Sequence, residues 1–225
     1  HNGRRRQRQM CIRDRVGDDF HINPEEIETK YYGVLTKIFN VARFASQFES
    51  PDDLSSPPEL NIEDIWILSE FDQSMATVEK AWKDVDIYTA AQTLKSFGTG
   101  IFPSHWLEMS KTRLYDGDIS ATWTIHRIVR DFLSAFSPIC PFFTHYLSTT
   151  LYGSSSVDVR AFPRLPSFHG SELFEELRVK TESLEEFNSM VWREKKERGL
   201  SLKSPISDIQ IPEFLNLFTD ALVNM

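Results

Sequence analysis

The sequence is poor in cysteine and has no long apolar run. Its 225 residues include two cysteines, Cys11 and Cys140, which lie far apart and lack the spacing of metal ligands. This arrangement argues against a disulfide framework and fits a reducing compartment. No apolar stretch approaches the roughly 20 residues that a helix needs to cross a bilayer. We therefore expect a cytoplasmic protein with no membrane partner.

Common catalytic signatures are also missing. The chain contains no glycine-rich phosphate loop of the GxxxxGK or GxGxxG type, no GxSxG elbow and no HExxH helix. His105 and Glu108 lie three residues apart, but no further metal ligands stand near them with clear spacing. His126 and His145 are interpreted as packing or surface residues. The sequence therefore predicts neither a catalytic centre nor a metal site in this chain.

Charge is distributed unevenly along the sequence. The first fifteen residues contain six arginines and one aspartate, whereas the remaining 210 contain 19 basic and 32 acidic residues. An acidic body argues against broad, nonspecific nucleic-acid binding, which depends on many phosphate contacts. Any RNA site must therefore be a local basic patch.

The arginine-rich start could be read as an RNA-binding arm. However, the segment Arg5 to Arg15, RRQRQMCIRDR, resembles translated adaptor sequence found at the ends of assembled reading frames. It also joins abruptly to an ordinary acidic, helix-forming sequence. We therefore expect residues 1–15 to be a non-native or disordered segment outside the fold.

Apolar residues recur every three or four positions along most of the chain, which predicts an all-α fold. Asn23-Pro24-Glu25-Glu26 is typical of a helix start, and Gly153 of a helix end. Gly98, Gly100 and Pro103 are expected to loosen or kink the third helix. Asp118 is placed to cap the fourth helix. The expected helices of this bundle span 23–48, 65–85, 90–101, 125–136 and 142–151.

The residues after Gly153 have a different character. A proline-spaced linker is followed by a long charged helix over 171–198, a short strand over 206–211 and a helix over 213–223. The expected organisation is therefore a helical bundle over 16–153, followed by a linker, a long helix and a small, incomplete C-terminal subdomain over 154–225.

Basic and aromatic residues gather around one helical segment. Trp106, Lys111, Arg113 and Tyr115 lie on it or just beyond it, so the two cations could hold phosphates while a ring stacks on an unpaired base. Amphipathic helices carry such residues routinely, however. By themselves these residues favour an ordinary helix surface over an RNA site.

Four ordered segments give the chain a family resemblance. They are K-x-x-N-x-x-R-F at 37–44, DIWIL at 64–68, HWLEMSKTRLY at 105–115 and SPICPFFTHYL at 137–147. Together they resemble the helical anticodon-binding domain of class I aminoacyl-tRNA synthetases, over most of residues 17–212. The motif W-x-E-x-x-K-x-R-L-Y resembles that of the valyl branch, whereas isoleucyl enzymes tend to have an arginine cluster at this place. His145, in place of a usual glutamate, and the glycine-rich stretch 97–102 depart from the family pattern.

The resemblance implies a fold and a function. The fold would be an all-α bundle with a small mixed C-terminal remnant, acting as a monomer that binds the anticodon stem and loop of a tRNA, chiefly valine tRNA. The parent enzyme would join valine to this tRNA with ATP and magnesium in an N-terminal catalytic domain. This chain has no HIGH or KMSKS motif and needs no cofactor, so alone it is expected to be inactive. The residues expected to face RNA are Lys37, Asn40, Arg43, Trp106, Lys111, Arg113, Arg127 and Arg130.

Two alternatives remain open. The chain could be the same domain of an isoleucyl or another class Ia synthetase, which would bind RNA with a different tRNA preference. It could also be a helical protein-interaction module without any RNA role, as the acidic balance and missing catalytic motifs allow. The interaction module predicts no salt-sensitive RNA binding, whereas another synthetase branch predicts RNA binding with the wrong tRNA preference.

Overall fold

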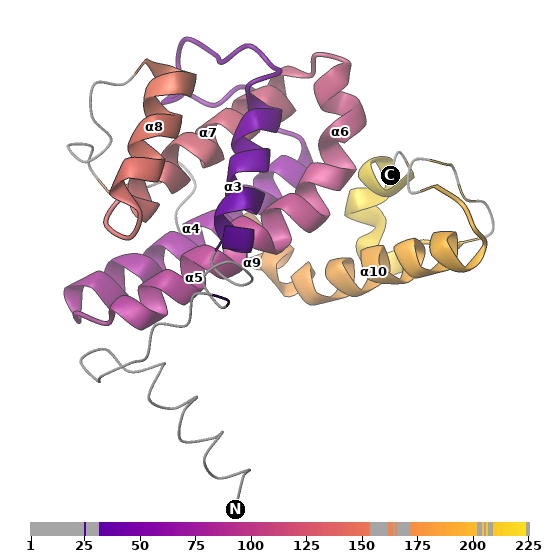
Figure 1. Ribbon diagram of the computed structural model, residues 1–225. Helices are drawn as coiled ribbons and strands as arrows, with labels where there is room; N and C mark the ends of the chain where they lie inside the picture. Colours follow the sequence, from indigo (N-terminus) through magenta and orange to yellow (C-terminus); the bar gives the residue numbers. More distant parts are fainter. Residues whose placement is uncertain are drawn as a thin grey trace, which may run out of the picture.

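The computed structural model describes residues 25, 32–153, 162–163, 165, 172–201, 204, 206 and 209–223. Residues 1–15, as well as Asn23 and Pro24 of the expected helix start, lie outside these ranges. The described parts of the chain are helices joined by turns and coil, without a strand (Figure 1). This confirms the all-α prediction. The expected strand over 206–211 is wrong at its described positions, where Ile206, Ile209 and Ile211 lie in coil.

The helices fall into two groups along the chain, and their labels are those of Figure 1. The first group comprises α3 (Tyr32–Ala45), α4 (Ile62–Lys83), α5 (Ile87–Thr99), the π-helical turn η2 (Phe102–Trp106), α6 (Leu107–Tyr115), α7 (Ile119–Phe136) and α8 (Pro141–Tyr152). The second comprises α9 (Glu172–Val179), α10 (Thr181–Glu197), the 3₁₀ turn η3 (Glu213–Phe218) and α11 (Thr219–Val223). No described helix is both long and apolar enough to cross a membrane.

Helix α7 forms the centre of the bundle. It contacts α3, α4, α5, α6 and α8, and nearly its whole length is buried. Ile125, Ile128 and Leu133 are at most 1% exposed. Removing this apolar surface from water is the main favourable contribution to folding.

Local sequence signals set the ends of α7 and α8 as predicted. The carboxylate of Asp118 accepts a hydrogen bond of 2.8 Å from the backbone nitrogen of Ala121, which satisfies one free amide of the first turn of α7. Gly153 ends α8 with a φ of 59°, a conformation that glycine adopts without strain. Both predicted caps are confirmed.

The predicted break in the third helix is confirmed as well. Helix α5 ends at Thr99, and the chain continues through a π-helical turn that contains Pro103. A wider turn of this kind accommodates a proline that an α-helix interior would not. As a result, Trp106 and Met109 face the interior, where each is at most 1% exposed.

The second expected helix ends earlier than its apolar pattern indicated. Helix α4 stops at Lys83, so Val85 is 74% exposed in a turn instead of lying on the buried face. Trp82 is only partly buried at the edge of the core. The prediction that the helix and its buried face reach Val85 is therefore wrong, because the spacing was extended past the helix end, whereas Trp82 lies within α4 and packs against the core.

The C-terminal helices pack on the bundle. Leu177 of α9 and Leu184 of α10 are fully buried in the same hydrophobic core as α4 and α7. Trp66 of α4 also donates a hydrogen bond of 2.9 Å from Nε1 to Oγ1 of Thr181. The expected single helix over 171–198 is two helices, which meet at Lys180. In Figure 1, α9 and α10 run beneath the bundle and away to one side.

Candidate nucleic-acid interface

Helix α3 presents a polar, basic surface to solvent. Lys37, Asn40 and Arg43 are all exposed, and their spacing of three residues places them along one side of the helix. Lys37 Nζ lies 3.5 Å from the carbonyl oxygen of Thr99. The structure thus brings together three of the residues predicted from the sequence, in a position open to a large ligand.

An aromatic group closes the far end of α3. The rings of Phe44, Phe48 and Tyr115 pack edge to face, with centroid separations of 5.2 to 6.0 Å. Tyr115 is 64% exposed, so this group ties the end of α6 to α3 and still offers an aromatic ring to solvent. The phenylalanines were missed as parts of a candidate site, although Phe44 directly follows Arg43 in the family segment.

Lys111 lies on α6, one turn before Tyr115. Its side chain is 35% exposed, and Nζ lies 2.5 Å from Oε1 of Glu108. Ion pairs within one helix at a partly exposed surface contribute little to stability, so the ammonium can exchange its partner for a phosphate at low cost. Lys111 therefore remains compatible with the predicted role.

Arg113 has a different environment. Its guanidinium donates to Asp64 over 2.5 Å, to Asp118 over 3.0 Å and also to Glu63, and its side chain is 16% exposed. Three carboxylates around one guanidinium leave an excess of negative charge, which repels a phosphate. The prediction that Arg113 faces RNA is therefore corrected: the residue joins α6 to the start of α4.

Trp106 is the second correction. Its side chain is 0% exposed, and Nε1 donates a hydrogen bond of 2.9 Å to Oδ1 of Asp64. Its ring stacks on Phe102 at 5.3 Å. A ring in this position cannot stack on a base unless the core opens. Trp106 is a core residue whose one polar atom is satisfied by a buried carboxylate.

The buried carboxylate of Asp64 organises this part of the molecule. Besides Trp106 and Arg113, it accepts a hydrogen bond of 2.5 Å from Oγ of Ser120, so three elements converge on one side chain. Burial raises the pKa of Asp64, and the hydrogen bonds and charge of Arg113 oppose that effect. Burial alone would lower the pKa of Arg113, but its carboxylate partners raise it, so the guanidinium stays charged.

The two arginines of α7 have separate roles. Arg127 is 8% exposed; it donates from Nε to Asp131 over 2.5 Å and from Nη1 to the carbonyl oxygen of Leu54 over 2.8 Å. It therefore braces the α3–α4 connection against α7, which corrects its predicted RNA-facing role. Arg130 donates from Nε to Asp131 over 3.2 Å, and its side chain is 27% exposed. Arg130 therefore remains a candidate.

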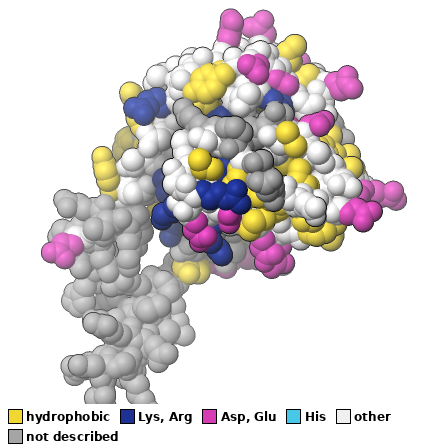
Figure 2. Space-filling model, turned by 90° about the vertical axis from the view of Figure 1, so that its right-hand side faces the viewer, with side chains coloured by type: hydrophobic (Ala, Val, Ile, Leu, Met, Phe, Trp, Pro, Cys, Tyr) yellow, Lys and Arg dark blue, Asp and Glu magenta, His cyan; other side chains and the backbone are white. Residues whose placement is uncertain are grey.

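The charge of the described helices is segregated. Helices α3, α5 and α8 contain no acidic residue, and α3 contacts both of the others. Helices α9 and α10, by contrast, contain eight acidic and four basic residues. Figure 2 shows the side of the molecule where α6 and α10 lie, with acidic side chains along its top and right-hand edge and a group of basic side chains near its centre. The charges of the helices alone therefore favour a polyanion at α3 over one at α9 and α10.

Comparisons with known proteins agree with this geometry. The family model described as the anticodon-binding domain of tRNA ligase matches residues 64–211. A valine–tRNA ligase of Saccharolobus solfataricus is 32% identical over 193 residues, which are 85% of this chain and 22% of that protein. The valine–tRNA ligase of Aeropyrum pernix is also 32% identical, over 89% of this chain and 25% of its own length.

A third relative, the valine–tRNA ligase of Nanoarchaeum equitans, is 27% identical over 92% of this chain and 26% of its own length. The chain thus spans about a quarter of the length of the curated relatives it matches. These names confirm the resemblance to the valyl branch. The helical fold and the match over residues 64–211 lead to one conclusion: the chain belongs to the anticodon-binding domain family of tRNA ligases.

Proposed function

We propose that this chain binds the anticodon stem and loop of a tRNA, as part of an enzyme that ligates valine to valine tRNA. Family membership and the names of its relatives support the proposal. The parent enzyme would act as a monomer and would supply the N-terminal catalytic domain, with ATP and magnesium used there. Among the residues described in this structure, no group of three or more His, Cys, Asp or Glu side chains is arranged to hold a metal ion.

One observation carries the choice of surface: an acidic molecule has one side on which neighbouring helices lack acidic residues. Lys37 and Arg43 are exposed on this side, with Asn40 between them. Two cations and an amide suit a phosphate backbone and the groups beside it, since lysine and arginine neutralise phosphates and asparagine both donates and accepts. Lys37, Asn40 and Arg43 together are called the basic strip. Tyr115 adds an exposed ring next to its end, beside Phe44, where an unpaired base can stack.

The test measures RNA affinity at several salt concentrations. The full chain is used, with the six arginines of residues 1–15 replaced by serine so that they do not contribute phosphate contacts. It is titrated with valine tRNA, isoleucine tRNA and a valine tRNA of altered anticodon. Preferential, salt-sensitive binding of unaltered valine tRNA is expected. Equal binding of isoleucine tRNA would contradict the valyl assignment, and absence of salt-sensitive binding would favour a protein-interaction module.

Charge-removing variants then locate the surface. Lys37→Gln and Arg43→Gln should each weaken binding and lower the slope of log K against log salt by about one. Lys196→Gln is the matched control, because it removes one exposed cation from the acidic helix α10. A control that weakens binding as much as the α3 variants would mean that the RNA lies on another face.

A further inference from the structure

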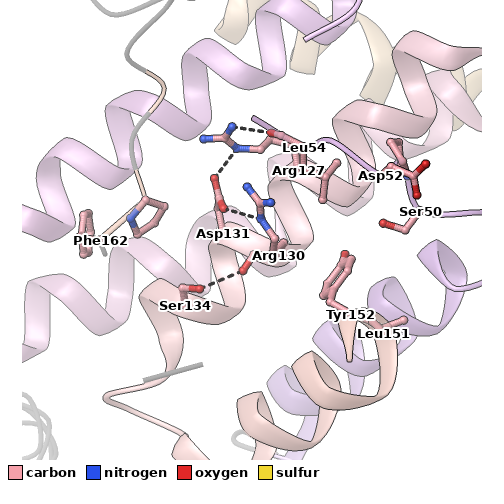
Figure 3. A pocket seen from close by; sticks show the side chains of 12 residues that line it. Ser50, Asp52, Leu54, Arg127, Arg130, Asp131, Ser134, Leu151, Tyr152 and Phe162 are labelled. Atoms are coloured by element: carbon pink, nitrogen blue, oxygen red, sulfur yellow. Dashed lines mark hydrogen bonds and ion pairs between the residues drawn. The ribbon is translucent and has the colours of Figure 1, made fainter. Parts of the chain in front are cut away.

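A cavity opens at the end of the bundle where α3 and α8 terminate. It has a volume of about 700 Å³ and lies between the α3–α4 connection, α7, the last turn of α8 and Phe162–Pro163 (Figure 3). This volume falls within the range of about 300–1,000 Å³ typical of small-molecule sites in proteins. The cavity is therefore large enough for one nucleotide.

Arg130 is the side chain in this cavity with unused donors. Its only hydrogen bond to a described residue runs from Nε to Asp131, over 3.2 Å. No described residue accepts a hydrogen bond from either terminal nitrogen, and in Figure 3 the Arg130 guanidinium lies between Phe162 on one side and Ser50 and Asp52 on the other. The buried Arg127 donates to the other oxygen of the same Asp131 carboxylate and so holds that carboxylate in place. The carboxylate in turn positions Nε of Arg130.

The charge of the cavity decides between two kinds of ligand. Its lining contains two arginines, Arg127 and Arg130, and two aspartates, Asp52 and Asp131, so its formal charge is zero. A phosphate alone gains little from a neutral site. A nucleobase edge, however, carries acceptors for the guanidinium beside donors for a carboxylate, and it needs no net charge. Donors and acceptors side by side therefore match a base better than a phosphate.

Two aromatic residues complete the cavity. Phe162 and Tyr152 line it on different elements, and unpaired bases are commonly held by such rings. Tyr152 is also linked to the α3 side: its hydroxyl lies 3.2 Å from Nδ1 of His126, whose Nε2 lies 3.1 Å from the carbonyl oxygen of Phe48. Phe48 belongs to the aromatic group at the end of α3. The cavity thus adjoins the basic strip.

We propose that this cavity receives a single unpaired nucleobase of the bound RNA, with Arg130 donating to base acceptors and Asp52 accepting from base donors. The inference rests on the proposed function and adds to it a site for one base. It assigns Arg130 to base recognition and leaves phosphate binding to α3.

The first experiment uses fluorescence. The anticodon stem and loop of valine tRNA is prepared with 2-aminopurine in place of one unpaired loop base at a time and titrated with the full chain. One loop position should change its fluorescence on binding, and Arg130→Gln should abolish that change. If the change at every position survives Arg130→Gln, the cavity holds no base and the proposal is overturned.

Affinity at several salt concentrations separates a base contact from a phosphate contact. Arg130→Gln should weaken binding about ten-fold while leaving the salt slope unchanged, because no phosphate contact is lost. A slope that falls by about one unit would identify a phosphate contact and contradict the assignment. Unchanged affinity in Arg130→Gln, with a loss in Arg43→Gln, would overturn the cavity but keep the proposed function. If the chain without the Arg130 substitution does not bind RNA, the proposed function and the base-binding cavity are both contradicted.

Asp52→Asn is a second variant, and the direction in which it changes RNA affinity distinguishes a bound base from a bound phosphate. Asp52 is exposed on a loop, so the fold should tolerate the change. Loss of its carboxylate should weaken the binding of a base that donates to it, whereas it would strengthen the binding of a phosphate. Glu49→Gln, also exposed and outside the cavity lining, controls for the general effect of removing one negative charge. Stronger binding by Asp52→Asn alone would contradict the proposal.

Discussion

Nη2 of Arg113 lies 2.5 Å from Oδ2 of Asp64, and the two residues are 49 positions apart in the chain. This contact joins HWLEMSKTRLY to DIWIL, two of the segments on which the family resemblance rests. Trp106 of the first segment donates to the same carboxylate. In this chain the two segments therefore contact each other inside the protein, and Trp106 and Arg113 are part of that contact.

The first prediction concerns this ion pair. Arg113→Met should lower the free energy of unfolding by about 3–5 kcal/mol, because it leaves the buried Asp64 without its cation. Arg113→Lys should be less destabilising, since it keeps the charge but cannot form the forked contact. Urea unfolding of the two variants measures the difference.

RNA binding provides the check on this interpretation. If Arg113 is structural, Arg113→Met should leave the salt slope of RNA binding unchanged under conditions where the variant is folded, because the lost cation neutralises no phosphate. A slope lowered by about one unit would restore Arg113 as a phosphate ligand.

The helices and their ends were largely predictable because their signals are local. The cap of Asp118 lies three residues from the amide it satisfies, and Gly153 ends α8 by its own backbone conformation. Apolar spacing likewise identified the buried face of α7. The pattern failed at Val85, because spacing does not report where a helix stops.

The site was less predictable because its contacts are long-range. Lys37, Asn40 and Arg43 were found as an exposed set through one family segment, whereas Trp106 was assigned to RNA through another, as an aromatic ring beside two cations. Its spacing from Phe102 and Met109 indicated a buried face. Asp64 begins the apolar run DIWIL, and a carboxylate buried with such a run needs a partner. Only the folded chain shows that this partner is Arg113.

Val85 supplies the second prediction. It stands in a left-handed conformation, with φ 58°, in the turn that ends α4. The backbone nitrogens of Val85 and Asp86 donate to the carbonyl oxygens of Trp82 and Ala81, an arrangement in which glycine is the usual residue. Since Val85 is 74% exposed, Val85→Gly loses little packing and should stabilise the protein by roughly 1 kcal/mol.

Thermal unfolding measures the gain, and the end of α6 offers the matched control. There Gly117 has φ 78° and the same pair of backbone hydrogen bonds. Gly117→Val should therefore destabilise by about 1 kcal/mol or more. A Val85→Gly variant that unfolds at a lower temperature than the parent chain would show that the valine makes contacts that outweigh its strain.

The third prediction concerns Gly98, on the face of α5 that meets α7. A Cβ at this position would lie 2.6 Å from Cζ of Phe132, whose ring is buried and packs against Phe136. The adjoining void is only about 20 Å³, so the ring has little room to move. Gly98→Ala should therefore destabilise by about 1–2 kcal/mol, despite the better helix propensity of alanine.

A double-mutant cycle in urea isolates this contact. In the Phe132→Leu background the obstructing ring atoms are gone, so Gly98→Ala should become neutral or favourable. An equal loss in both backgrounds would place the steric conflict elsewhere in the helix.

The fourth prediction concerns the pH dependence of stability through His126. Its Nε2 faces the carbonyl oxygen of Phe48, which can only accept, so Nε2 carries the proton. The hydroxyl of Tyr152 lies 3.2 Å from Nδ1 and donates to the carbonyl oxygen of His126 itself, also over 3.2 Å. Burial lowers the pKa of His126 below its ordinary value of 6.5, although the hydrogen bond to Phe48 opposes this. The unfolded chain therefore binds a proton that the folded chain resists. Stability from this residue is present at neutral pH and is lost as the pH falls through 6.5.

Comparison with His126→Gln tests the sign. Glutamine can donate and accept but does not titrate, so the variant should be less stable than the parent chain at pH 8, with the difference shrinking at pH 5.5. Burial raises the pKa values of Glu63, Glu70 and Glu185, which pushes stability the opposite way, but it does so equally in both proteins and cancels. Melting temperatures across this range measure the difference. A constant gap would mean that the folded and unfolded chains hold the His126 proton equally well, and that burial of the ring does not affect its titration.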